Sequence, residues 1–317
     1  MNIVSSSFDV FRRYPVFLVP LLTVWIIYAP TVLYLRYGVN WDVLATSEAV
    51  LINLGAIFLF AFLLTMSCSV LLELIEIVES DQKPGLGRAI RATMGSNLVH
   101  MLPIVVVWTV IWFVLAVIQA LLSRKKNRGD RPKFSAEDAA RTLMGGGRFS
   151  LSAAFFRALQ KAVRMVVFLI LPAIAWERMG FIRGTKRGLA VFRSQLGRFA
   201  EGFAITELAT IVLFLPPALL AMLTRSFDVT LPTGVWVAVI IYTGCAWSYS
   251  IYLEQMYMAE LYLWNLKWER TSKARELRGE EPLAFDKVPR PHLLDNVHDL
   301  LEPAARNRPA SSLASAS

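Results

Sequence analysis

Three basic side chains lie at helical spacing beside an apolar run. Arg157, Lys161 and Arg164 occupy positions i, i+4 and i+7, which places them on one face of a helix. Arginine binds phosphate as a fork and lysine as a point charge, so this basic stripe is a candidate contact for a lipid phosphate. The alternative is that the long side chains snorkel to the membrane interface.

Two acidic residues, Glu207 and Glu254, lie in or beside apolar runs later in the chain. At 1.5 Å per residue from the expected cytoplasmic side, both carboxylates lie roughly 7 Å deep. Antiparallel neighbouring helices would bring them to one level, where they could share a proton or form a cation site with Tyr257. The alternative is that each acid pairs with a cytoplasmic base such as Arg178 or Arg198.

Motifs of known enzyme classes are absent. The chain has no G-x-S-x-G, H-E-x-x-H or G-x-x-x-x-G-K, and "MGGGRFS" at 144–150 lacks the Lys-Ser/Thr ending of a phosphate loop. In the tail, "HLLDNVHD" offers two histidines and two aspartates to a metal, but we favour a weak amphipathic turn with solvated ends for these residues: His292, Asp295, His298 and Asp299. We therefore predict no catalytic residues, no cofactor and no metal.

The composition points to a membrane protein. Of the 317 residues 56% are hydrophobic, the mean hydropathy is +0.49, and roughly 20 apolar residues suffice to span a bilayer. Phe155–Trp176 reaches span length only by including Lys161 and Arg164. Six candidate spans result: Tyr14–Leu35, Ala49–Leu72, Leu98–Leu122, Phe155–Trp176, Gly202–Thr224 and Val229–Leu253.

The predicted fold class is all-α, a polytopic membrane protein with six transmembrane helices and interfacial amphipathic helices. The membrane domain covers 1–266, and a cytoplasmic tail, 267–317, is expected to be largely disordered past 302. The first run follows Arg12 and Arg13 and lacks a small-x-small cleavage site, so we expect a retained span and not a signal peptide. Cys68 and Cys245 lie in apolar runs, which predicts buried, reduced thiols.

The distribution of bases predicts the orientation. With six spans and both termini cytoplasmic, 20 of the Lys and Arg residues in the loops and termini are cytoplasmic and 11 are external. The positive-inside rule favours this orientation. The basic loop 123–154 disagrees, because its "SRKKNRGDRPK" would be external. A four-span alternative, with runs three and four as re-entrant hairpins, would place nearly every base inside.

Two similar segments suggest an internal repeat. Val10-Phe11-Arg12 and Val191-Phe192-Arg193 each lie in a short amphipathic segment before an apolar run, and "GRAIRATMG" is a weaker copy between them. Three units of an interfacial helix and two spans fit the chain: 1–80, 84–179 and 182–266. Interfacial helices are basic and aromatic by nature, which is the alternative explanation. The apolar positions of the copies are Val4, Phe8 and Phe11; Ile90 and Met94; and Leu189, Phe192 and Leu196.

The chain resembles the bacterial and archaeal six-span proteins of the Yip-like superfamily, which includes the membrane domain of some glycerophosphodiester phosphodiesterases. The matching segments are "SSSFDVFRRYPVFLVPLL", "FLILPAIAWERMGFIRGTKRGLAVFRSQLGRF" and "AELYLW" with "RGEEPLAF". Together they cover about 1–122 and 155–285. The resemblance implies an α-helical six-span fold and carries no activity, because no phosphodiesterase domain is fused here.

The first expectation for function is a non-enzymatic protein of the bacterial inner membrane that binds or organises lipid or a partner protein. A small-solute or lipid transporter is the second, and a membrane-embedded enzyme acting on lipid the third. The net charge of +9 gathers at the ends of apolar runs. The expected partners are therefore membrane lipids, anionic ones included, and a homo-oligomer or partner membrane protein, but no nucleic acid.

Overall fold

The computed structural model describes residues 3–80, 83–123, 151–292, 294 and 300, and all regular elements within them are helical. Six helices are long and apolar enough to cross a membrane, which confirms the predicted all-α polytopic class. Short 3-10 and π turns extend α2 to Pro15–Gly38. The six are α2 (Val19–Leu33), α3 (Thr46–Glu79), α5 (Leu98–Ser123), α7 (Leu151–Ala175), α9 (Leu196–Ser226) and α10 (Thr233–Glu276).

A short helix precedes each odd-numbered span, as the repeat predicts. These helices are α1 (Ile3–Arg13), α4 (Leu86–Ala92), which continues through a π turn into α5, and α8 (Phe181–Ser194). The order of short helix, long helix and long helix therefore occurs three times. The expected apolar positions do not all pack inward, because Phe8, Ile90 and Met94 are exposed while Val10 and Ala89 are buried.

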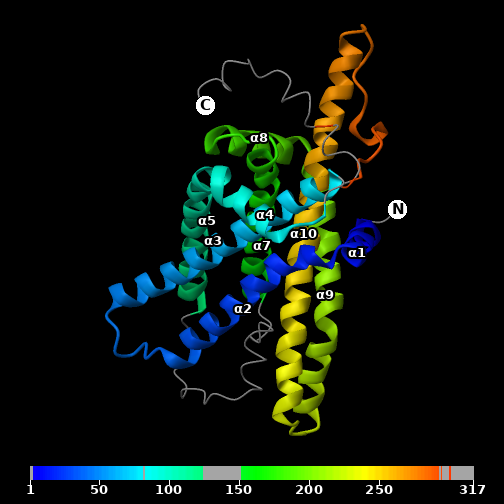
Figure 1. Cartoon of the computed structure of the whole chain (residues 1–317). Coiled ribbons are helices and arrows are strands. Elements are labelled where there is room, and N and C mark those ends of the chain that lie inside the picture. The colour runs from blue at the N-terminus through cyan, green and yellow to red at the C-terminus, as the bar shows by residue number, and fades with distance from the viewer. Residues whose placement is uncertain (1–2, 81–82, 124–150, 293, 295–299, 301–317) are drawn as a thin grey trace.

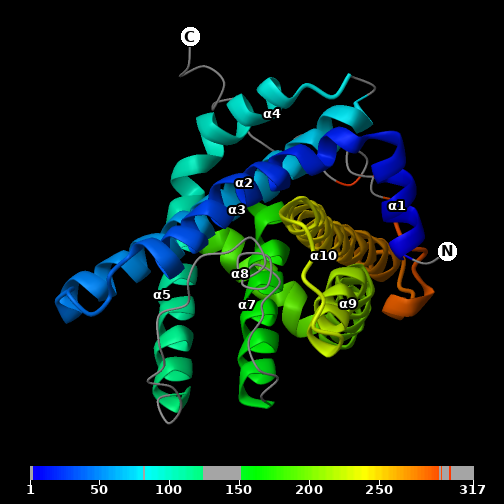
Figure 2. The ribbon, with the colours of Figure 1, turned by 90° about the horizontal axis from the view of Figure 1, so that it is seen from below.

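The long helices form three pairs that meet at one end and diverge at the other (Figure 1). Helix α2 packs on α3, α5 on α7, and α9 on α10, while contacts of α3 with α5 and of α7 with α10 join the pairs to one another. Seen from below, α2–α3 leaves the centre in one direction and α5–α7 in another, with α9–α10 beside them (Figure 2). We call the end where the pairs meet the inner end and the other the outer end.

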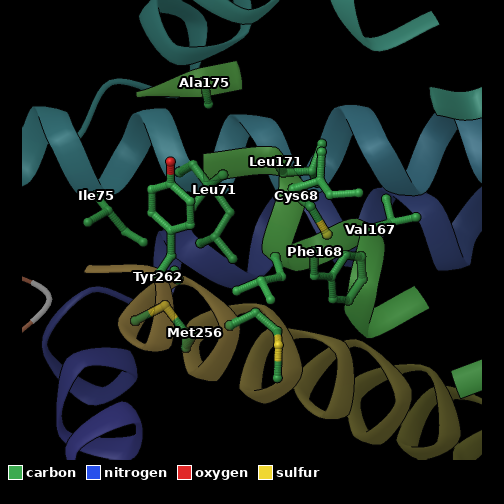
Figure 3. Close-up of a cluster of buried hydrophobic side chains, with 14 of the residues drawn as sticks. Cys68, Leu71, Ile75, Val167, Phe168, Leu171, Ala175, Met256 and Tyr262 are labelled. Carbon is green, nitrogen blue, oxygen red and sulfur yellow. The ribbon is translucent and has the colours of Figure 1, made fainter. Parts of the chain in front are cut away.

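Helix α10 forms the centre of the inner end. Every residue from Ser250 to Leu266 is buried, so this stretch is enclosed on all sides, as expected for a helix in the middle of a bundle. Figure 3 shows its Met256 and Tyr262 close to Cys68 and Leu71 of α3 and Phe168 of α7. The core thus joins three helices that are far apart in the sequence.

The outer halves of the helices are far less covered. None of the first fourteen residues of α3, 46–59, is buried, and only 11% of the most apolar stretch of α9 is buried, against 61% for α7. Trp236 and Val239 of α10 form a separate small cluster with Leu220 and Leu231 at the outer end of their own pair. The α9–α10 pair therefore packs on itself at its outer end.

The chain after α10 turns back along that helix. The Trp264 indole N–H donates to Val288 O at 2.9 Å, and that of Trp268 to Leu283 O at 2.8 Å. Phe285 packs on Trp264 with ring centroids 4.4 Å apart. The beginning of the predicted tail is thus attached to the membrane domain.

Two further sequence predictions concern the cysteines and the metal-binding candidates of the tail. Cys68 is buried as expected, but Cys245 is exposed, because it lies on a side of α10 that no other described helix covers, whereas Gly244 and Ala246 next to it are buried. Most of the basic loop 123–154, the tail past 302 and three of the four tail residues considered for a metal lie outside the described residues: Asp295, His298 and Asp299. No metal-binding group of three ligands occurs within the described part of the chain.

Candidate functional site

The basic stripe lies on α7, which begins early enough to include all three bases. This helix runs from Leu151 without interruption, so Lys161 and Arg164 lie within a span of 22 residues, Ala154–Ala175. Its charged face is turned toward α10 and α9 and not only toward lipid. The ion pairs between α7 and these two helices form the best-defined polar site of the described bundle.

Glu254 binds Arg164 through two parallel hydrogen bonds. Arg164 Nε donates to Glu254 Oε2 and its Nη2 to Oε1, both at 2.8 Å. The Glu254 side chain is only 1% exposed. A two-point guanidinium–carboxylate contact is the strongest pairing geometry available to these groups, so burial of both charges is compensated.

Lys161 lies between the two acids. Its ammonium nitrogen is 2.7 Å from Glu207 Oε2 and 3.7 Å from Glu254 Oε1. The same nitrogen donates to Phe203 O at 3.4 Å and lies 4.9 Å from the centre of the Phe203 ring. The lysine side chain is 7% exposed and that of Glu207 is 48% exposed, so the Glu207 carboxylate lies at the surface of the bundle.

The sequence predicted that both acids lie roughly 7 Å from the cytoplasmic side, whereas the structure brings them to the level of Lys161 and Arg164. The estimate for Glu207 counted from Gly202, but α9 begins at Leu196. Glu207 therefore lies eleven residues, roughly 16 Å, from the start of its helix. The alternative partners are also corrected: Arg198 contacts Glu201 and Asp286, while the acids pair with the stripe itself.

The remaining two candidate residues are Arg157 and Tyr257. Arg157 is exposed one turn before Lys161, toward the outer end of α7. Tyr257 donates its hydroxyl hydrogen bond to Arg198 O at 2.7 Å and packs on Gly202. It contacts neither intramembrane acid, so the geometry gives no cation site built from Glu207, Glu254 and Tyr257.

The arrangement is electrically balanced. Two bases face two acids across α7, α9 and α10, and we call Lys161, Arg164, Glu207 and Glu254 the charge network. Charged groups inside a membrane protein usually face one another or a polar path. Lys161 and Arg164 already contact carboxylates, which leaves them less available to a phosphate, and their ion pairs join α7 to α9 and α10.

A second polar cluster, which sequence reasoning did not predict, lies at the inner end. Arg187 of α8 donates to both carboxylate oxygens of Glu269, at 2.9 and 2.5 Å, and lies 3.9 Å from Glu177. Tyr262 donates to Glu177. Burial acts to lower the pKa of Arg187, but hydrogen bonding to Glu269 and nearby charges raise it above its ordinary value, so the guanidinium stays ionised.

Gln255 is a further residue that the sequence did not single out. It is fully buried on α10, and neither its amide nitrogen nor its amide oxygen has a hydrogen-bond partner within the described part of the chain. Ser248 and Ser250 on the same helix also bury hydroxyls without partners there. Buried polar atoms of this kind are commonly satisfied by internal water.

No protein-family model, curated protein or solved structure matches this chain.

Proposed function

We propose that this chain is a non-enzymatic integral membrane protein that organises lipid among its three helix pairs. The observation that carries the proposal is the divergence of the pairs beyond a shared core. Large apolar side chains remain exposed along the outer halves, among them Leu51 on α3, Val110 on α5 and Val212 on α9. In a bilayer, such surfaces are covered by lipid acyl chains or by another apolar partner.

The lengths of the helices support this arrangement. Helices α3, α9 and α10 have 34, 31 and 44 residues, whereas roughly 20 residues cross the hydrocarbon core. Long helices are accommodated by tilting or by extending beyond the bilayer. Pairs that tilt away from one another leave room between them, and acyl chains are the material that a membrane supplies to fill it.

A transporter is the alternative, and one observation favours it. Gln255 and its neighbouring serines are buried polar groups without partners among the described residues, as a water-filled path would require. Against a continuous path, the charge network ties α7 to α9 and α10 at mid-helix. The third expectation, a membrane-embedded enzyme, is the least supported, because the acids and bases of the charge network pair with one another.

The proposal is tested by asking whether lipid or water lies between the pairs. Nitroxide labels are attached to single cysteines at Leu51, Val110 and Val212 in a Cys245→Ser background, and the protein is reconstituted in bilayers. Electron paramagnetic resonance then measures collisions with oxygen, which enters hydrocarbon, and with a water-soluble nickel chelate. The proposal expects high oxygen and low nickel accessibility at all three positions.

A label at Asp42, in the loop between α2 and α3, is the matched control for access to water. Nickel accessibility at Leu51 or Val110 equal to that of the loop control would replace the lipid proposal by the transporter. Low accessibility to both reagents at all three positions would indicate protein cover instead. In that case the partner protein or homo-oligomer of the initial expectation would take precedence over lipid.

We also propose that the protein resides in the bacterial inner membrane with both termini in the cytoplasm, so that the inner end faces the cytoplasm. The excess of bases at this end and the positive-inside rule support this orientation. The resemblance to the Yip-like superfamily is retained as part of the same proposal. It implies a six-span α-helical fold, with which the six long helices are consistent, and it adds no activity.

A further inference from the structure

The three short helices carry exposed bases at the inner end of the molecule. Six of these bases pair with no acid among the described residues, and Asp9 is the sole acid in the sequences of the three helices. By contrast, Arg187, also on α8, faces inward to Glu269. Besides Arg88 on α4, the exposed bases are the following six: Arg12 and Arg13 on α1, Arg91 on α4, and Arg183, Lys186 and Arg193 on α8.

Exposed apolar side chains lie beside these bases. Phe8 on α1 is 50% exposed, Ile90 on α4 39% and Ile182 on α8 66%. A helix that combines outward apolar groups with outward bases is typical of the membrane–water interface, where the apolar groups enter the bilayer and the bases meet headgroups. Surfaces directed only toward water or toward an acidic protein do not need the apolar component.

The outward face of α8 is fixed by its packing. An added Cβ at Gly184 would lie 2.7 Å from Ile174 Cγ1, and one at Gly188 2.8 Å from Ile170 Cα. These glycines therefore bring α8 into close contact with α7. Because this side of α8 is occupied, Arg183, Lys186 and Arg193 are held on the opposite, exposed side.

We propose that α1, α4 and α8 form a collar that binds anionic lipid headgroups. The inference rests on the proposed lipid-organising function and assigns its lipid class and the place of recognition. Lys and Arg near a membrane surface attract anionic lipid, and six bases spread over three helices suit several headgroups better than one compact ligand. The basic stripe is the less suitable site, because Lys161 and Arg164 already contact carboxylates.

The experiment uses the full chain reconstituted in vesicles of equal parts phosphatidylglycerol and phosphatidylcholine, then extracted in mild detergent. The lipid retained per protein and the ratio of the two lipids are measured for the wild type and for R183Q/K186Q/R193Q. The wild type should be enriched in phosphatidylglycerol, and the α8 variant should lose at least half of that enrichment. Adding R12Q, R13Q and R91Q should remove nearly all of it.

The matched control is R36Q/R225Q/K273Q, which removes three exposed bases that lie off the collar. It should retain the wild-type lipid ratio. If the six-base variant keeps native elution and helicity and its ratio of phosphatidylglycerol to phosphatidylcholine is unchanged, the collar proposal is overturned. That outcome is the one expected if this surface binds an acidic protein and not lipid. Lipid retention near zero in the wild type instead contradicts the proposed function itself, so the two failures are distinguishable.

Discussion

Glu254 is the residue on which the charge network depends most. Its buried carboxylate holds Arg164 at two points and lies 3.7 Å from Lys161. The change Glu254→Gln removes a negative charge and leaves the buried bases Lys161 and Arg164 incompletely compensated. Breaking a buried pair by removing one partner typically costs about 3–5 kcal/mol, so we expect a clear fall in the thermal unfolding midpoint of the purified protein.

Two variants serve as controls for that loss. Glu201→Gln breaks a pair with Arg198 in which the glutamate is 44% exposed, and exposed pairs contribute about 0–1 kcal/mol. Arg164→Met combined with Glu254→Met removes both charges and should recover much of the stability. A Glu254→Gln protein as stable as Glu201→Gln would show that the network does not stabilise the bundle.

Gln255 leads to the opposite expectation. Because its amide is buried without a partner in the described chain, Gln255→Met should raise the free energy of unfolding by about 1 kcal/mol, the lower range for an unsatisfied polar group. Gln195→Met is the control, since Gln195 donates to Asn265 at 3.4 Å. A Gln255→Met protein that is less stable than wild type would mean that internal water or a ligand satisfies this amide.

At this scale the sequence predicted which groups are unusual but not how they pair. Charges beside long apolar runs single out Lys161, Arg164, Glu207 and Glu254 directly. Their pairing depends on where α9 begins and on which helices are neighbours, and neither follows from hydropathy. Gln255 gave no signal, because one amide among aromatic residues does not interrupt the apolar pattern.

Among the helices, α8 shows how a glycine surface joins two elements. An added Cβ at Gly188 would lie 2.8 Å from the Ile170 backbone, and backbone cannot move aside as a side chain can. Gly188→Ala should therefore destabilise the protein by about 1–3 kcal/mol, the usual cost of overpacking. Thermal unfolding in detergent measures the effect, and circular dichroism verifies that the helices remain.

Gly55 provides the matched control for helix propensity. It lies inside α3 with no atom within 4 Å of an added Cβ, so Gly55→Ala gains propensity of up to about 1 kcal/mol without a clash. We expect it to match or exceed the wild type in stability. A Gly188→Ala protein that behaves like Gly55→Ala would show that α8 does not pack closely on α7.

Hydropathy predicted the long helices well, and periodicity predicted the existence of the short ones. The packing faces of the short helices were less predictable. In α8 the buried residues are Gly184, Gly188 and Val191, whereas the predicted apolar positions were Leu189, Phe192 and Leu196. Periodicity finds large apolar side chains, and glycine, which permits the closest approach, carries no hydropathy signal.

At the scale of the whole molecule, the converging helix pairs and the collar give the protein two different ends. The pairs converge where α1, α4 and α8 lie and diverge toward the opposite side (Figure 1). If the collar faces the cytoplasm, apolar cover is needed mainly in the outer leaflet and anionic headgroups in the inner leaflet. Orientation therefore decides which leaflet supplies each lipid, and it follows from the base count and not from the fold.

Cysteine labelling determines this orientation. In a Cys245→Ser background, a cysteine at Asp42 lies between α2 and α3 at the outer end, and one at Glu280 lies just beyond α10 at the inner end. With 20 bases expected inside and 11 outside, we expect a membrane-impermeant maleimide added to intact cells to label position 42 and not position 280. Permeabilised cells should show labelling at both, which controls for reactivity.

Labelling of 280 but not 42 in intact cells would invert the protein, and the collar would then meet the outer leaflet. Labelling of both positions in intact cells would place the α2–α3 loop and the C-terminal end of α10 on one side, which contradicts the five crossings expected between them.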